Sequence, residues 1–244
     1  MTLEIPLKCI TRDHRDVYIT ALMLLSERNI PFMLGGAFAV WFYTGNWRHT
    51  HDIDVFTVPE MVPTAAAVLA EAGFEDLGEQ APGDRNWIYH GVKEEIIVDI
   101  IWKSANRLAS VTDEWLEQSR DGELLGIKVK FIPMEELVWS KIFTMNKHRC
   151  DWPDVMKIFR SNCAEFNWNR LLNILGDHWL LFAGVLDVFD WQYPADARCV
   201  PAEIRQELIK RRLEYRPEPD SPSREKLLDP WIHTRPEDVC CWEP

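Results

Sequence analysis

The chain has 244 residues, of which 47% are hydrophobic and 27% charged, and its net charge at pH 7 is -12. This composition is typical of a soluble globular protein rather than a disordered or membrane one. The length allows one large domain or two modest ones, each with its own core. The acidic balance argues against broad, sequence-independent binding to nucleic acid, because the affinity of such binding comes mainly from neutralising phosphates.

The first half of the chain alternates between helical and strand patterns. Apolar residues at helical spacing, among them Val17, Ala21, Leu24 and Leu25, predict an amphipathic first helix over residues 12–29. Strand-like apolar runs bounded by glycine or proline then alternate with shorter helical patterns. The expected strands cover residues 31–36, 51–58, 86–92, 94–102 and 126–132, and the expected helices cover residues 37–45, 63–73 and 111–119.

From Pro133 onward the apolar period changes from two to about 3.6, which indicates a helical region. Residues 217–236 contain five prolines and many charges, so we expect an extended tail there. These patterns predict an α+β fold with a domain at 1–133, a helical domain at 134–216 and a tail at 217–244. The helices expected in the second domain cover residues 134–146, 152–162, 168–176, 179–190 and 201–215.

Two aspartates alternate on the strand expected at 51–58. Side chains two residues apart share one face of a strand, so Asp52 and Asp54 point the same way, about 7 Å apart along the strand, while Ile53 and Val55 point into the core. Two such anions repel each other unless a cation lies between them. Magnesium takes few protein carboxylates and keeps its other positions for water and substrate phosphates, so this pair predicts a magnesium site.

A third carboxylate, Asp99, lies in the apolar run EEIIVDIIW. It is expected to be buried on either face of that strand, at a cost of several kcal/mol unless a cation compensates it. A metal ion is the favoured partner, and a structural salt bridge to an arginine such as Arg48 is the alternative.

The glycine pair Gly35 and Gly36 precedes the helix expected at 37–45. Without Cβ atoms the backbone can approach a phosphate, and the start of the helix directs unpaired N-H groups at the anion. A simple tight turn is the alternative explanation of the pair.

Charged residues also mark the helical region. Lys141 falls within the apolar stripe of the helix expected at 134–146, so it either meets an anion, such as a phosphate, or extends to the surface. Arg149 is a second candidate for a phosphate contact. For Asp151 and Asp154, in the run DWPD, we favour capping of the next helix.

Several features bear on compartment and partners. No apolar run is judged long enough to cross a bilayer, and Met1 to Asp13 lacks the features of a secretory signal. The six cysteines show none of the paired spacings of zinc sites or disulfide frameworks, so we expect reduced thiols and a cytoplasmic protein with no membrane partner. Between Glu75 and Glu123, twelve acidic residues face five basic ones, which indicates a solvated surface or a face that attracts a cationic partner.

The order of these motifs resembles the DNA polymerase beta-like nucleotidyltransferase superfamily. Its hallmark is a glycine pair at a strand-to-helix turn, then an Asp-x-Asp strand, then a third carboxylate on a later strand; here 15 residues separate Gly36 from Asp52. The segment LVWSKIF, with the following HRCDWPDV, is similar to the region after the palm in abortive-infection type toxin transferases. The resemblance covers roughly residues 15 to 160.

The resemblance implies a nucleotidyltransferase palm, a mixed twisted sheet flanked by helices, followed by a C-terminal helical region. It implies that two magnesium ions are held by Asp52, Asp54 and Asp99 as catalytic residues. The residues expected to bind or support the substrate are Gly35, Gly36, Arg48, Thr50, Lys141, Arg149 and Asp151.

The expected reaction moves a nucleoside monophosphate, for example from ATP, to an acceptor hydroxyl and releases pyrophosphate. The acceptor is left open among an RNA end, a protein side chain and a cationic small molecule, and the acidic stretch leans toward the last. The alternative is a catalytically inactive protein of the same fold that binds a nucleotide or a partner protein.

Overall fold

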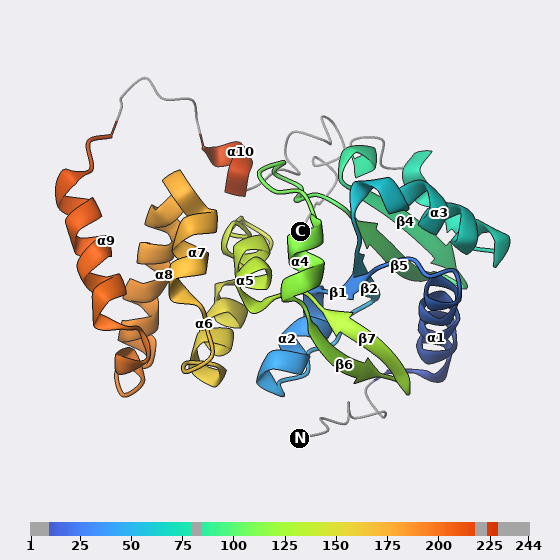
Figure 1. Cartoon of the computed structure of the whole chain (residues 1–244), viewed down its shortest axis with the longest axis horizontal. Helices are drawn as coiled ribbons and strands as arrows, with labels where there is room; N and C mark the ends of the chain where they lie inside the picture. The colour runs from blue at the N-terminus through green and yellow to red at the C-terminus, as the bar shows by residue number, and fades with distance from the viewer. Residues whose placement is uncertain (1–9, 80–83, 218–223, 229–244) are drawn as a thin grey trace, which may run out of the picture. The chain divides into compact units, whose positions relative to one another are not determined.

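A computed structural model describes residues 10–79, 84–217 and 224–228 of the chain. The chain forms two compact units, and the division falls between Pro133 and Met134. Unit 1 contains the sheet and unit 2 is helical (Figure 1). This architecture confirms the predicted α+β fold with a helical region after the sheet.

Unit 1 is built on a mixed seven-stranded sheet in the order β3-β4-β5-β2-β1-β7-β6. Strands β2 and β5 pair in parallel, as do β1 and β7, and the other neighbours are antiparallel. The strands are β1 (Met33–Leu34), β2 (Asp52–Phe56), β3 (Glu75–Asp76), β4 (Ile88–Lys93), β5 (Ile96–Ile101), β6 (Arg120–Leu124) and β7 (Ile127–Phe131). The helices are α1 (Arg12–Glu27), α2 (Gly36–Thr44), α3 (Val62–Glu71) and α4 (Asp113–Gln118).

The core of unit 1 follows from the alternation of its strands. Ile53 and Val55 of β2 and Val98 and Ile100 of β5 are fully buried, as alternate residues on one face of paired strands should be. Helix α1 packs beside α3 and β5 and is held at its start by Thr11, whose hydroxyl caps the N-H of His14.

Two strands of unit 1 were not predicted. Both β3 and β6 lie at the edges of the sheet and carry charged residues, Glu75 and Asp76 in β3 and Arg120, Asp121 and Glu123 in β6. Edge strands are often charged because charge discourages pairing with another chain, so their sequences lack the apolar alternation that marks inner strands.

Unit 2 contains a core of aromatic and aliphatic side chains contributed by successive helices. Phe159, Trp168, Phe182 and Phe189 are buried and in ring contact around Phe159. The helices are α5 (Met134–Ile142), α6 (Trp152–Ser161), α7 (Trp168–Leu175), α8 (Trp179–Gln192), α9 (Ala202–Glu214) and α10 (Glu225–Leu228).

Two boundary predictions need correction. Helix α5 ends at Ile142 rather than at residue 146, because the chain turns there and Met145 pairs with Cys150 in an antiparallel bridge. The tail, predicted to be extended, contains the short helix α10, and its other residues from 218 to 223 and from 229 onward lie outside the described residues.

The expectation of reduced thiols is wrong for one pair of cysteines. Cys163, just after α6, and Cys199, at the end of a short 3-10 turn before α9, form a disulfide across 36 residues of sequence. The helical packing of unit 2 brings their Cα atoms within 5.2 Å, a proximity that the spacing in sequence could not indicate. Cys150 is a free, exposed thiol.

One apolar stretch is longer than we expected from the sequence. Trp168–Gln192 is, by length and composition, apolar enough to cross a membrane, and 44% of its most apolar window is buried inside the protein. Its second half is α8, whose Phe182, Val185 and Phe189 form part of the core of unit 2. A buried core helix meets the same criterion as a membrane span.

Candidate functional site

Three carboxylates share one face of two neighbouring strands in unit 1. The parallel register of β2 and β5 sets Asp54 beside Asp99, and Asp52 lies two residues earlier on β2. Neighbouring strands are about 5 Å apart, and residues in register point to the same face. The parallel pairing thus brings Asp99 beside the acid pair of β2, from which it is far removed in sequence.

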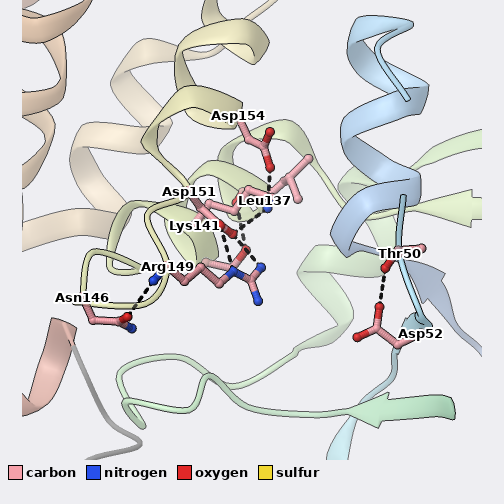
Figure 2. A network of polar contacts seen from close by, with 9 residues as sticks. Thr50, Asp52, Leu137, Lys141, Asn146, Arg149, Asp151 and Asp154 are labelled. Carbon is pink, nitrogen blue, oxygen red and sulfur yellow. Dashed lines mark hydrogen bonds and ion pairs between the residues drawn. The ribbon is translucent and has the colours of Figure 1, made fainter. Parts of the chain in front are cut away.

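Each carboxylate has a distinct local environment. The hydroxyl of Thr50 donates a hydrogen bond of 2.5 Å to Asp52 Oδ1 (Figure 2). Asp99 is only 7% exposed, and its Oδ1 lies 2.7 Å from Nδ1 of His90, its register partner on β4. Asp99 is buried, as predicted, and a hydrogen bond links it to a histidine on the adjacent strand.

The donor set fits magnesium in kind, although it is not a closed cage. Within residues 10–79, 84–217 and 224–228, no three acidic, histidine or cysteine side chains are close enough together to hold a metal ion. Magnesium in triphosphate sites needs only one or two protein carboxylates, because water and phosphate oxygens complete its shell. Asp52 and Asp54 could supply two such oxygen donors, and Asp99, beside Asp54 in register, could add a third.

Neither position of the glycine pair has room for a side chain. Gly36 has a φ of +52°, and a Cβ atom built on it would lie 1.6 Å from Asp54 Oδ2. At Gly35 a Cβ atom would lie 2.2 Å from the ring of Phe56, and the Gly35 N-H donates to the Asp54 carbonyl at 2.9 Å. The first turn of α2 and the second carboxylate of β2 are therefore in direct contact, which a side chain at residue 36 would prevent.

Tyr18 belongs to this site and was not predicted. It lies on α1, is 1% exposed, and its pKa is raised well above the usual range by burial and by the charges of Asp52, Asp54 and Asp99. The sequence signal was a tyrosine inside the apolar stripe of the first helix, a position that most often indicates core packing.

The other predicted residues of unit 1 lie in the loop before β2. Thr50 touches the site directly through Asp52. Arg48 is exposed, two residues away in the same loop. Its role in binding substrate stays a prediction.

In unit 2, Lys141 meets carboxylates rather than solvent. Its side chain is 5% exposed, and its ammonium group contacts Asp151 at 2.8 Å and Asp154 at 3.0 Å (Figure 2). Arg149 adds two hydrogen bonds to Asp151, from Nε at 2.8 Å and from Nη2 at 2.7 Å. A role for Lys141 or Arg149 in binding phosphate stays a prediction.

The capping role favoured for Asp151 is wrong. Asp151 stands at the N-cap position of α6, with a proline in the first turn, but its side chain makes no capping hydrogen bond. Burial acts to raise its pKa, yet hydrogen bonds from Arg149 and the charges of Lys141 and Arg149 outweigh burial and hold the pKa below its ordinary value. The carboxylate therefore joins two cations instead of the helix start.

One family model matches most of the chain. The family model described as "Nucleotidyl transferase of unknown function (DUF2204)" matches residues 14–229. No curated protein matches the chain in sequence.

The solved structures to which the chain is similar are distant from it in sequence. The antibiotic-resistance factor ANT(2'')-Ia, in complex with adenylyl-2''-tobramycin, is 15% identical over 72% of this chain and 99% of its own, with a TM-score of 0.48. An antigenic nucleotidyltransferase-like protein from Paracoccidioides brasiliensis is 16% identical over 78% of this chain and 93% of its own, with a TM-score of 0.47. The lincosamide adenylyltransferase LnuA, bound to lincomycin, is 17% identical over 61% and 96%, with a TM-score of 0.43.

Proposed function

Since the chain belongs to the nucleotidyl transferase family described as of unknown function (DUF2204), we propose that it is a magnesium-dependent enzyme that transfers a nucleoside monophosphate from a triphosphate such as ATP to an acceptor hydroxyl. The observation that carries the proposal is the face shared by Asp52, Asp54 and Asp99, with the Asp54 carboxylate against Gly36 at the start of α2. That face offers metal ligands beside backbone N-H groups suited to phosphate.

The reaction is a substitution at the α-phosphorus of the triphosphate. The acceptor oxygen forms a bond to that phosphorus, the bond to the oxygen bridging to the β-phosphorus breaks, and pyrophosphate leaves with the electron pair. Asp52 and Asp54 would hold two magnesium ions, and bound magnesium would supply charge stabilisation at the attacking and leaving oxygens. Asp99 would complete the ligand set or take the proton of the acceptor hydroxyl.

The protein's own residues act mainly by positioning. Thr50 fixes the orientation of Asp52 through its 2.5 Å hydrogen bond, and His90 does the same for Asp99 at 2.7 Å. The N-H groups at the start of α2 are proposed to face the phosphates, and Arg48 to contact them from the loop before β2. Preorganised donors and charges of this kind lower the barrier without reorganising during the reaction.

The rival function is binding without catalysis. It is favoured by one observation: among the described residues, no three acidic, histidine or cysteine side chains are grouped closely enough to hold a metal ion. A protein of this kind would bind a triphosphate, or a partner protein, but release no pyrophosphate.

The test is a transfer assay with triphosphates labelled at the α-phosphate, incubated with magnesium and a cell extract, with label then followed into RNA, protein and small molecules. We expect label in one of these fractions and none with Asp54→Asn. Full transfer by that variant refutes the catalytic assignment. The binding protein is supported instead if calorimetry finds that the triphosphate binds, while no pyrophosphate is released with any of the RNA, protein or small-molecule fractions.

A further inference from the structure

The face of unit 1 that carries the three carboxylates ends in apolar side chains. Side chains alternate along a strand, so Phe56 of β2 points to the same side as Asp54, two residues earlier and about 7 Å away along the strand. Its register partner on β5 is Ile101, two residues after Asp99. Phe56 is 8% exposed and Ile101 is 6% exposed. The row of acids on these two strands therefore ends in an apolar pair.

Trp115 of α4 lies against the Phe56 end of this row. Its indole is tilted by 27° from the plane of the Phe56 ring, with ring centres 6.3 Å apart. The segment before α4 is tied to the end of β5, because the Val111 N-H donates to the Trp102 carbonyl at 2.9 Å. Trp115 is partly exposed to solvent, in contrast to the buried Phe56. We call these two rings, Trp115 and Phe56, the aromatic platform.

The aromatic platform borders the turn that is proposed to hold the phosphates. A Cβ atom at Gly35 would lie 2.2 Å from the ring of Phe56, and one at Gly36 would lie 1.6 Å from Asp54 Oδ2. One glycine of the turn thus contacts the platform, and the next contacts the carboxylates. A nucleoside triphosphate also has two such parts, a charged phosphate chain and a flat aromatic base, joined through the ribose.

The charges around Trp115 favour a base over a phosphate chain. Asp113, Glu114 and Glu117 are exposed acidic residues on the same short helix. Their negative field disfavours the triphosphate chain at this position but accepts a neutral base, whose ring N-H and amino groups are hydrogen-bond donors. Stacking on an aromatic side chain is open to every base, because each base has a π face.

We propose that Trp115 binds the base of the triphosphate, which stacks on the exposed part of the indole while the phosphates lie at Asp52, Asp54 and the start of α2. Phe56 supports the indole. Because the contact is stacking, the four common nucleoside triphosphates bind with similar strength. The proposal rests on the proposed function, because it places the nucleotide of that same reaction.

The test compares two ligands that share a phosphate chain and differ in the base. ATP and inorganic tripolyphosphate, each with magnesium, are titrated into the full chain by calorimetry. Trp115→Leu keeps apolar bulk against Phe56 without a flat ring, and Trp115→Phe keeps a ring. We expect Trp115→Leu to bind ATP about five-fold to ten-fold more weakly and tripolyphosphate as the natural protein does. Trp115→Phe should bind ATP within about three-fold of the natural protein.

Two controls separate recognition of the base from other effects. Trp191→Leu makes the same replacement at a side chain that is 82% exposed on α8, and it should bind both ligands as the natural protein does. Titrations with GTP, CTP and UTP should show a similar loss in Trp115→Leu, because stacking tolerates any base. A loss confined to ATP would contradict recognition by stacking.

The outcomes distinguish this proposal from the proposed function. It is overturned if Trp115→Leu binds ATP normally, or if that variant loses ATP and tripolyphosphate equally, since an equal loss marks damage to the phosphate site or the fold. A natural protein that binds neither ligand refutes both proposals. Pyrophosphate release from ATP is measured separately. No release together with Trp115-dependent binding of ATP refutes the enzyme and leaves the platform; release together with normal binding of ATP by Trp115→Leu refutes the platform alone.

Discussion

Replacing Gly36 by alanine tests the contact between the turn and the second carboxylate. The new Cβ atom would lie 1.6 Å from Asp54 Oδ2, a separation that forces the carboxylate to move. A displacement of about 1 Å at a catalytic group can reduce the rate about 100-fold, so we expect at least that loss in kcat/KM for pyrophosphate release. The φ of +52° adds a strain of about 1–2 kcal/mol for any residue with a Cβ atom.

Gly73→Ala is the matched control for this strain. Gly73 has a φ of +82°, and a Cβ atom there meets nothing within 4 Å. Both variants should lose about 2–8 °C in melting temperature, from about 2–4 °C per kcal/mol in a chain of this size. Only Gly36→Ala should lose activity and magnesium-dependent binding of ATP. Equal activity in the two variants would refute the idea that Asp54 must stay against the turn.

Three further predictions concern unit 2. Lys141→Met should lower the free energy of unfolding by about 3–5 kcal/mol in a urea titration, because it leaves buried carboxylates short of a cation; a change below about 1 kcal/mol would contradict the buried ion pairs. The lowered pKa of Asp151 stabilises the folded protein fully above the ordinary pKa of 3.8, and this stabilisation is lost as the pH falls below that value. The free energy of unfolding from urea titrations should therefore be lower at pH 3 than at pH 6. The difference should be smaller in Asp151→Asn. Cys163→Ser should lower the free energy of unfolding by about 3–4 kcal/mol under oxidising conditions, because the disulfide bridges a 36-residue separation, and should lower it little with reductant present. A natural protein that is equally stable with and without reductant would argue against the disulfide.

The inner strands and the carboxylate face could be predicted from the sequence because strand alternation is a local signal. The run DIDVF alternates acidic and apolar residues, which predicts the buried face of that strand. The run IIVDII is apolar except for Asp99, which predicts a buried carboxylate. The glycine pair was equally visible, although its φ and its contact with Asp54 were not.

The rest depends on contacts between residues far apart in sequence. His90 reaches Asp99 only because β4 and β5 pair in that register, and Tyr18 joins the site only because α1 packs against this part of unit 1. In unit 2, Asp151 looked like a helix cap because local pattern cannot show the buried Lys141 that competes for its carboxylate. Residues that pair across elements are invisible to any local pattern.

The most direct test of the central claim is anomalous diffraction from crystals grown with Mn²⁺ and a triphosphate analogue that cannot release pyrophosphate. We predict one or two manganese peaks, each about 2 Å from a carboxylate oxygen of Asp52 or Asp54, which is close to the usual magnesium–oxygen distance. The triphosphate should lie against the start of α2. An analogue bound elsewhere, or no peak between these two carboxylates, would contradict the account.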